Sequence, residues 1–409
     1  MPESSAPQQS ATFARRVRRA RERRGLTRAA AAGRVGRSYE WWKAIETGRL
    51  RMPRLPMLLR MADVLAVSDL ADLTGDARLA SASYRNPAHP ALPQIRSALA
   101  AYRITAPDGE PPSVAALTAR LRHAWLVWHG IGHHRSGTAD LLPALLADAQ
   151  HAARAHDGTD RRAALALLAQ VYHLTQLFLS FQPAPELVIL TGDRAMAAAQ
   201  DADDPRAIAA AAWYMGHIHR DGGEAAAARV DLALTAASLL RPERHEEDLA
   251  LHGLLHLAVA LSHAKTASAG PAERHWDIAD RAASALGEGY AHPWLVFGRG
   301  VVDGYALTLR TDLVQARAAV RVAADLRTEA VPSATRRAYQ AIEQARAYSL
   351  AGEPIATVHF LTQAQGISPE TTGYNLFARS AVSDLAVSGP AAIRTQAGAL
   401  AREWGVDAA

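Results

Sequence analysis

Charged and hydrogen-bonding side chains gather between residues 25 and 51 of this 409-residue chain. Arginine and lysine can pair with phosphate oxygens, and tyrosine, serine and glutamate can exchange hydrogen bonds with base edges in a DNA groove. The chemistry that this segment supports is therefore noncovalent recognition of a polyanion. The candidate contact residues are Arg28, Arg37, Ser38, Tyr39, Glu40, Trp41, Lys43, Arg49 and Arg51.

Two short helices joined by a tight turn must position these side chains. Thr27 can cap a first helix, and Gly36 ends it because glycine tolerates the left-handed cap conformation. Ser38 starts a second helix, on which Trp42 and Ile45 share an apolar face because they lie three residues apart. The other faces of the second helix are then free to meet a ligand.

The order of residues around these helices resembles the helix-turn-helix domain of Xre-type, lambda-repressor-like transcriptional regulators. The similarity covers residues 12–74. It rests on Gly-Leu-Thr at 25–27, Gly36, Ser38, the Trp42-x-x-Ile45-Glu46 motif, Gly48 and the basic loop 49–51. It implies a five-helix DNA-binding domain over residues 11–75, with residues 38–47 inserted in the major groove of double-stranded DNA.

The resemblance also implies how the bundle is held together. The side chains expected to turn inward are Phe13, Val17 and Ala20 upstream and Leu55, Leu58, Leu59, Ala62 and Leu65 downstream. Arg21 and Glu46 occupy the two positions that pair in the family, so a buried ion pair is expected between them. Regulators of this type usually dimerise, so a homodimer is implied as well.

Two arginines depart from the pattern of the family. Arg28 stands where glutamine is usual, and Arg37 stands where an aliphatic residue usually follows the inter-helix glycine. Both changes add positive charge near the expected phosphates. Glu40 can accept a hydrogen bond from cytosine N4. The expected phosphate contacts are Arg28, Arg37, Lys43, Arg49 and Arg51, the expected base readers are Tyr39 and Glu40, and Trp41 is expected near the sugar-phosphate rim.

Charge is distributed unevenly along the chain. Residues 11–75 contain 15 Arg or Lys against 6 Asp or Glu, a balance of +9, whereas the whole chain has a net charge of +5. The remainder must therefore carry −4. A basic segment on a mildly acidic protein favours phosphate neutralisation by that segment.

Composition excludes several classes of chemistry. The chain has no cysteine, so disulfides and thiolate chemistry are absent. It has neither a phosphate-binding Gly-x-x-x-x-Gly-Lys-Ser/Thr loop nor a Gly-x-Ser-x-Gly nucleophile motif, so we expect no enzymatic activity and no cofactor. Nothing in it resembles a signal peptide or an apolar run of about 18 residues. A cytoplasmic, nucleoid-associated protein is expected.

Two histidine pairs have the four-residue spacing that puts both imidazoles on one helix face. They are His129 with His133 and His252 with His256. Zinc sites need a third protein ligand, and neither pair has a carboxylate or a third histidine at a fixed offset. We therefore expect no metal site.

Outside the basic domain the sequence is divided by composition. Residues 1–10 are polar and are expected to form a disordered tail, and residues 76–112 form a proline-rich linker with room for a short helix at 94–103. From residue 113 to 405, alanine and leucine recur every three to four residues without strand signals. The chain is therefore predicted to be all-α.

One pattern recurs in this long helical part at offsets of 0, 7, 12 and 16 residues. It occurs as Gly216-Gly223-Ala228-Leu232, Gly304-Thr311-Ala316-Val320 and Ala345-Gly352-Thr357-Leu361. These offsets resemble the tetratricopeptide repeat, which implies an α-solenoid over residues 113–405 with a concave ligand groove. The residues expected to line that groove are Trp213, Tyr214, Trp294 and Phe297.

A helix-turn-helix domain followed by a tetratricopeptide-like solenoid resembles the large regulators of actinobacteria. It implies a sequence-specific transcriptional regulator whose solenoid binds a peptide, small molecule or protein, mediates dimerisation, or does both. The alternative is a solenoid scaffold for a partner protein, in which DNA binding is only auxiliary. A footprint that persists at moderate salt would distinguish the regulator from the scaffold.

Overall fold

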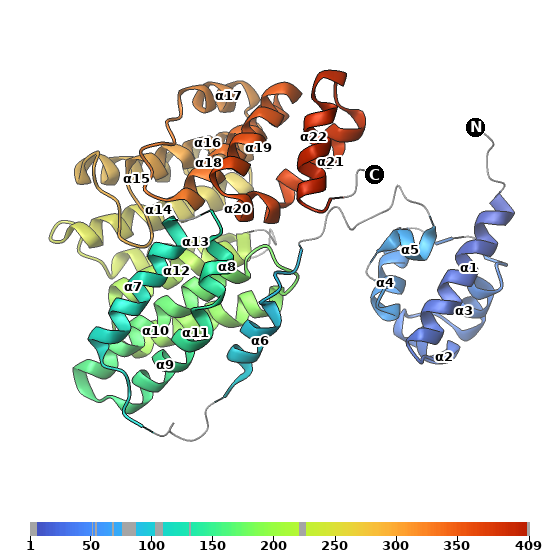
Figure 1. Cartoon of the computed structure of the whole chain (residues 1–409), viewed down its shortest axis with the longest axis horizontal. Coiled ribbons are helices and arrows are strands. Elements are labelled where there is room, and N and C mark those ends of the chain that lie inside the picture. The colour runs from blue at the N-terminus through green and yellow to red at the C-terminus, as the bar shows by residue number, and fades with distance from the viewer. Residues whose placement is uncertain are drawn as a thin grey trace. The chain divides into compact units, whose positions relative to one another are not determined.

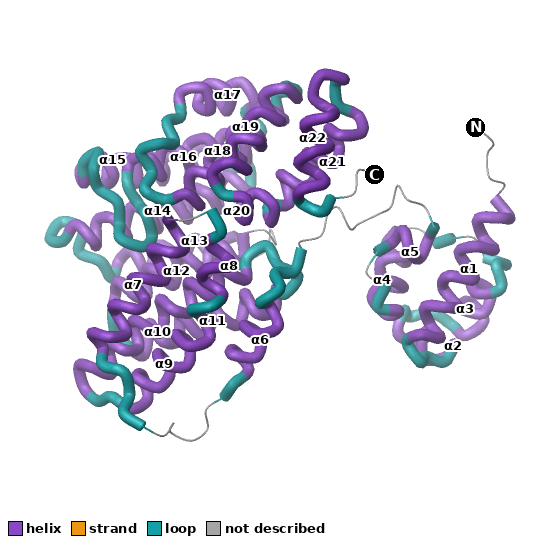
Figure 2. Tube along the Cα trace, viewed as in Figure 1, coloured by secondary structure: helices purple, strands orange, loops and turns teal. Residues whose placement is uncertain are grey.

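All regular secondary structure in the computed structural model is helical over the residues that it describes, as Figure 1 and Figure 2 show. Those residues are 6–50, 52–53, 55–67, 69–75, 87–102, 109–130, 132–220 and 226–406. The all-α prediction is confirmed there. The chain divides into two compact units, Met1–Arg85 with Arg379–Ala409 and Asn86–Ala378, and each is described by itself.

The head, residues 6–75, contains five helices in the expected order. They are α1 (Ala6–Arg23), α2 (Arg28–Arg34), α3 (Tyr39–Glu46), α4 (Leu55–Leu65) and α5 (Leu70–Thr74). The prediction of an unstructured tail through residue 10 differs from the structure, because α1 begins at Ala6. Pro7 is compatible with this start, since a residue in the first helical turn has no intrahelical partner for its N–H.

A small apolar core holds the head together. Its fully buried members are Phe13, Val17, Ala20, Ala31, Ala32, Val35, Trp42, Ile45, Leu58, Met61, Ala62, Leu65 and Leu73. Leu59 was expected inside, but 48% of it is exposed. Met61 takes that place because it shares a helix face with Leu58 and Leu65, whereas Leu59 lies about 100° away around α4. The side chain of Leu55 lies outside the description.

The body, Asn86–Ala378, contains a succession of helices. They are α6 (Leu92–Ala100), α7 (Val114–Gly130), α8 (His134–Ala139), α9 (Leu142–Ala155), α10 (Gly158–Leu179), α11 (Pro185–Asp201), α12 (Pro205–Arg220), α13 (Ala226–Ser238), α14 (Glu246–Lys265), α15 (Ala269–Leu286), α16 (Arg299–Asp312), α17 (Ala316–Asp325), α18 (Ala334–Leu350), α19 (Pro354–Ile367) and α20 (Pro369–Tyr374).

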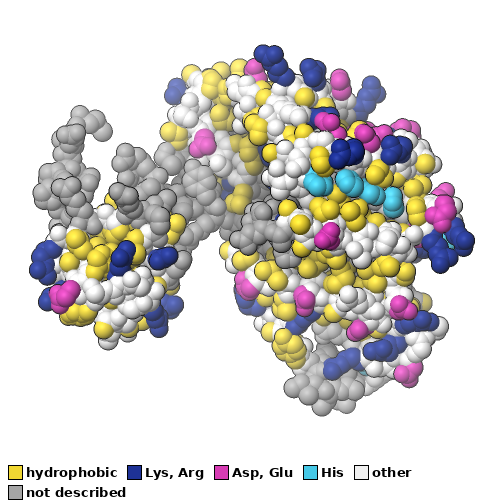
Figure 3. Space-filling model, turned by 180° about the vertical axis from the view of Figure 1, so that it is seen from behind, with side chains coloured by type: hydrophobic (Ala, Val, Ile, Leu, Met, Phe, Trp, Pro, Cys, Tyr) yellow, Lys and Arg dark blue, Asp and Glu magenta, His cyan; other side chains and the backbone are white. Residues whose placement is uncertain are grey.

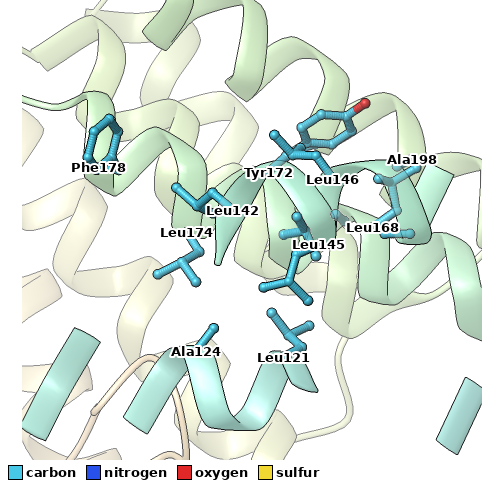
Figure 4. Close-up of a cluster of buried hydrophobic side chains, with 14 of the residues drawn as sticks. Leu121, Ala124, Leu142, Leu145, Leu146, Leu168, Tyr172, Leu174, Phe178 and Ala198 are labelled. Carbon is cyan, nitrogen blue, oxygen red and sulfur yellow. The ribbon is translucent and has the colours of Figure 1, made fainter. Parts of the chain in front are cut away.

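Neighbouring helices of the body pack on one another, most extensively α10 on α11, α14 on α15 and α18 on α19. Figure 4 shows part of the resulting core, where Leu121, Leu145 and Leu168 approach one another from α7, α9 and α10. Close packing depends on a small residue at Gly253 of α14. A Cβ atom there would lie 2.4 Å from the Phe297 ring. Helix α14 and the segment that carries Phe297 therefore approach too closely at this point to admit alanine without movement.

The body closes on itself between α7 and α18. The Thr335 hydroxyl donates to the Trp128 carbonyl over 2.8 Å, and His129 Nδ1 lies 2.9 Å from the Ser333 hydroxyl. These partners are more than 200 residues apart in sequence. An array in which each element touched only its neighbours would lack such contacts.

The boundaries of the body differ from those expected for the linker and the solenoid. Helix α6 spans Leu92–Ala100 rather than 94–103, with Pro93 in its first turn, and buries Leu92, Ile95 and Leu99 in the core of the body. Residues 76–86 and 103–108 of the expected linker lie outside the described residues. Part of the proline-rich stretch thus belongs to the body, because its apolar residues recur at helical spacing.

Two more helices follow, α21 (Leu376–Ser388) and α22 (Ala391–Glu403). Arg379 Nη1 donates to the Trp404 carbonyl over 2.7 Å and ties the two together. The body ends at Ala378, well before the expected solenoid end at residue 405. Within the described part of the chain, each helix is too short or too polar to cross a bilayer.

Candidate nucleic-acid interface

Capped helix ends fix the angle between α2 and α3. The Thr27 hydroxyl accepts from the Ala30 amide over 3.1 Å, and the Ser38 hydroxyl accepts from the Trp41 amide over 3.2 Å. Gly36 has a φ of 69°, the left-handed conformation that the sequence predicted for it. Arg37 N then donates to the Ala32 carbonyl over 2.9 Å, which closes the turn. These local bonds aim the N-terminal end of α3 outward.

A single carboxylate holds α3 against the rest of the head. The Glu46 side chain is fully buried and accepts from Arg21 through Nε at 2.5 Å and Nη2 at 3.2 Å. Arg28 Nε donates to it over 2.7 Å, and Trp42 Nε1 donates over 2.8 Å. Arg21 also donates to the Leu26 carbonyl. Helices α1, α2 and α3 are thereby joined at one point.

The charge state of Glu46 follows from these bonds. Burial by itself would raise the pKa of the Glu46 carboxyl, but the hydrogen bonds from Arg21, Arg28 and Trp42 outweigh it and lower that pKa. Glu46 therefore stays ionised at neutral pH. Removing one member of such a buried charge network typically costs about 3–5 kcal/mol, because the remaining charge is left unpaired.

The outer face of α3 is open to solvent. Tyr39 is 44% exposed, and the Glu40 and Lys43 side chains are 71% and 40% exposed. Lys43 Nζ lies 3.9 Å from Glu40 and 6.0 Å from the Tyr39 ring centroid. The predicted base readers thus lie together on the surface. This surface, with Arg37, Ser38 and Trp41, is called the reading face below.

The cations around the reading face fall into two groups. Arg37 lies 5.8 Å from the Trp41 ring, and Arg49 donates to the Thr47 hydroxyl over 3.3 Å. Both are exposed, and no carboxylate of the described residues pairs with either. They can therefore take a phosphate. Arg51 lies outside the described residues.

Arg28 differs from the other predicted phosphate contacts. Its side chain is 32% exposed, but its Nε is bound to Glu46, so the sequence interpretation missed a structural role. The same holds for Trp42, which supplies a hydrogen bond besides its apolar ring. The four-residue spacing of Trp42 and Glu46 on α3 was the available signal, since it puts both on one helix face.

The predicted groove residues lie mostly in the core of the body. Trp213, Tyr214 and Phe297 are 0%, 2% and 0% exposed, so they do not line an open groove. Large aromatic rings fill the space between helices that alanine-rich sequences leave. Trp294 is partly exposed and lines a cavity of about 170 Å³ together with His173.

Histidines of the body contact one another across helices, and Figure 3 shows a row of histidine side chains on the surface. His256 Nδ1 lies 2.8 Å from His275 Nδ1, and the His252 and His263 rings adjoin this pair. His129 has both ring nitrogens engaged, with Ser333 and the Trp294 carbonyl. No three His, Asp or Glu side chains in the described ranges are arranged to hold a metal ion.

Residues 12–73 match the family model described as a helix-turn-helix domain. No curated protein matches the chain. The matched range begins within α1, ends within α5 and contains the whole reading face. The head is a helix-turn-helix DNA-binding domain, and its second and third helices have the cap-turn-cap arrangement described above.

Proposed function

We propose that this protein is a sequence-specific, DNA-binding transcriptional regulator of the Xre type, resembling the actinobacterial regulators that carry a tetratricopeptide-like body. The observation that carries the proposal is the reading face, which is exposed on a helix clamped from behind by the buried Glu46 network. A rigid helix with free polar side chains can read base edges at little entropic cost. A loosely held helix would lose conformational entropy when it became ordered on the DNA, and this loss would weaken binding.

Each exposed side chain has a distinct task in this proposal. Tyr39 and Glu40 face base edges in the major groove, where Glu40 can accept from cytosine N4. Arg37, Arg49 and Arg51 neutralise phosphates and set the register of α3 on the duplex. Arg28 contributes chiefly by holding Glu46, and the Trp41 ring lies at the sugar-phosphate rim.

One reading helix spans few base pairs, so two copies are needed for tight binding. We propose a cytoplasmic homodimer that reads two half-sites about 34–36 Å apart. The body then has the role of sensor, dimer interface or both. Neither role needs a cofactor or catalysis.

Titration of the full-length protein into duplex DNA at two salt concentrations tests the proposal. A regulator protects one palindromic site at moderate salt, and the Arg37→Ala/Arg49→Ala variant should reduce the slope of log affinity against log salt by about two. The matched control is Arg161→Ala/Arg162→Ala, which removes two exposed arginines from α10 of the body. Weak binding that is blind to sequence, with equal effects of both variants, would favour the scaffold function instead.

A further inference from the structure

Arg336 on α18 is a partly buried cation that has no carboxylate partner among the described residues. Its Nη1 donates to the Tyr305 hydroxyl over 3.0 Å, and its main-chain N–H donates to Ser333. No ion pair joins its guanidinium to a carboxylate of the described residues. Arg336, Tyr305 and Tyr339 are each only partly buried, so part of each residue reaches the surface.

Other arginines of the body show what a paired guanidinium looks like in this protein. Arg206 is held by Glu247 and Asp248, Arg299 by Asp280 and Asp303, and Arg346 by Asp312 and Glu343. Arg346 lies on the same helix as Arg336. Burying a charge without a counter-charge costs free energy. The lack of a paired carboxylate at Arg336, when these other arginines have one, therefore requires an explanation.

The Arg336 guanidinium interacts with three tyrosines and is hydrogen-bonded to one of them, Tyr305. Tyr214, Tyr305 and Tyr339 are its electrostatic neighbours, contributed by α12, α16 and α18. Burial raises the pKa of Tyr214 and of Tyr339, so their hydroxyls stay protonated at neutral pH. Tyr305 accepts from Arg336 through its oxygen, which leaves its O–H free to donate. Within the described part of the chain, the group therefore offers a cation and several neutral donors but no anion.

A second guanidinium reinforces this field. Arg135 is 1% exposed, donates to the Phe178 carbonyl over 2.5 Å, and lies 5.0 Å from the Tyr374 ring. The neighbouring carboxylate of Glu370 accepts from the Arg135 main-chain N–H. Tyr339 interacts electrostatically with both Arg135 and Arg336. Two positive charges thus adjoin the same phenol.

We propose that Arg336, Tyr305 and Tyr339 bind the phosphate or carboxylate group of a small anionic ligand. The guanidinium would donate in parallel to two oxygens, and the tyrosine hydroxyls would donate to the remaining lone pairs. Arg135 would stabilise the bound charge without touching it. Both phosphate and carboxylate satisfy this donor set, so the experiment below separates them.

The position of the group suggests what binding would change. Arg336 follows Ser333 and Thr335, whose side chains make the contacts with α7 that close the body. A ligand bound to Arg336 would stabilise this closure by mass action. A resulting effect on DNA affinity rests on the proposed function, whereas anion binding by the body does not.

The test is calorimetric titration of inorganic phosphate and of citrate into the full-length protein without DNA, with sodium chloride at matched ionic strength as the blank. At least one anion should bind with one site per chain, and Arg336→Gln should weaken it about tenfold or more. Arg346→Gln removes a paired arginine from the same helix and should leave affinity within about twofold. The proposal is wrong if neither anion binds, if Arg336→Gln binds like wild type, or if both variants weaken binding equally.

Two further variants keep the test usable if Arg336→Gln does not fold. Tyr305→Phe removes one hydroxyl and should weaken the anion about threefold or more. Arg336→Met replaces an unpaired charge by an apolar chain, so its Tm in anion-free buffer should equal or exceed that of wild type. Phosphate or citrate should raise the Tm of wild type only. If the anion raises the Tm of Arg336→Met by as much as that of wild type, the proposed anion site is wrong.

Discussion

In the head, one buried carboxylate, Glu46, accepts hydrogen bonds from Arg21, Arg28 and Trp42, whereas in the body Arg336 has no carboxylate partner among the described residues. In the Glu46 network the carboxylate is paired with cations of the chain itself, and three helices are locked in place. In the Arg336 group, hydrogen-bond donors remain that have no anionic acceptor in the described part of the chain. Arginine can therefore hold helices together, as Arg21 and Arg28 do, or remain available to a ligand, as we propose for Arg336. The difference is whether the chain itself supplies the carboxylate that pairs with it.

Lowering the pH should destabilise the body more than the head. Burial lowers the pKa of His129 to about 4 and that of His173 to about 3. An unfolded histidine takes up a proton near pH 6.5, so stability is lost as pH falls from about 6.5 toward these values, by on the order of a few kcal/mol for each histidine. Scanning calorimetry between pH 7 and 5 should show that the Tm of the body decreases before the Tm of the head does.

His173→Phe is the control for this acid effect. The substitution keeps a ring beside Tyr214, whose centroid lies 4.5 Å from that of His173, but removes the titrating group. It should reduce the pH dependence of the body, and the part due to His129 should remain. Glu46 behaves differently, because its pKa is lowered from 4.5 and its contribution is lost only as pH falls below about that value. If the head unfolds at a lower temperature than the body at pH 5, the prediction that acid destabilises the body more than the head is wrong.

Glu46→Ala should be the most damaging single change in the head. It leaves two guanidinium groups and an indole N–H without their acceptor, at a cost of about 3–5 kcal/mol. Hydrogen exchange of α1 and α3 in the full-length chain measures the effect. Glu40→Ala on the same helix is the control, because that side chain is 71% exposed and should change stability by less than about 0.5 kcal/mol.

Ser38→Ala should have an intermediate effect on the head. It removes the hydroxyl that accepts from the Trp41 amide, a helix cap that contributes about 1 kcal/mol. Faster exchange of the first α3 amides, with unchanged exchange in α1, is the expected result. Uniform acceleration across the head would show that the cap acts through global unfolding instead.

Glu40→Gln should change stability least of these substitutions, but it should change which DNA sequence is preferred. Glu40→Gln keeps the size of the side chain but adds a donor, so affinity should shift at one base pair by about 1–3 kcal/mol while the Tm stays constant. Binding selections from a randomised operator library measure this shift. Uniform weakening at every position would remove Glu40 from the base readers.

Local patterns predicted the helices and turns of the head well because the contacts that cap and end them are short in sequence. Thr27 and Ser38 cap helices three residues away, and Gly36 adopts the left-handed turn. The error at Leu59 arose where one apolar run offered two adjacent leucines, Leu58 and Leu59, and only packing against other helices could choose between them.

The body was predictable only as a succession of helices. An aromatic residue in an alanine-rich helix fits a groove or a core equally well by pattern, and Trp213 and Phe297 proved to be core. The histidine pair on α14 acquired a neighbour, His275, from α15, which no spacing within one helix reveals. Arg336 was not singled out at all, since its isolation depends on which charges other helices bring near it.

The sequence by itself determined the helices, their caps and the basic head, because these depend on interactions between residues three or four positions apart. The tertiary structure alone decided that Arg28 serves Glu46, that α7 meets α18, and that Arg336 faces tyrosines rather than a carboxylate. Such contacts join residues 18 to more than 200 positions apart. At those separations, packing of apolar surface brings charges together, and no local periodicity records which ones meet.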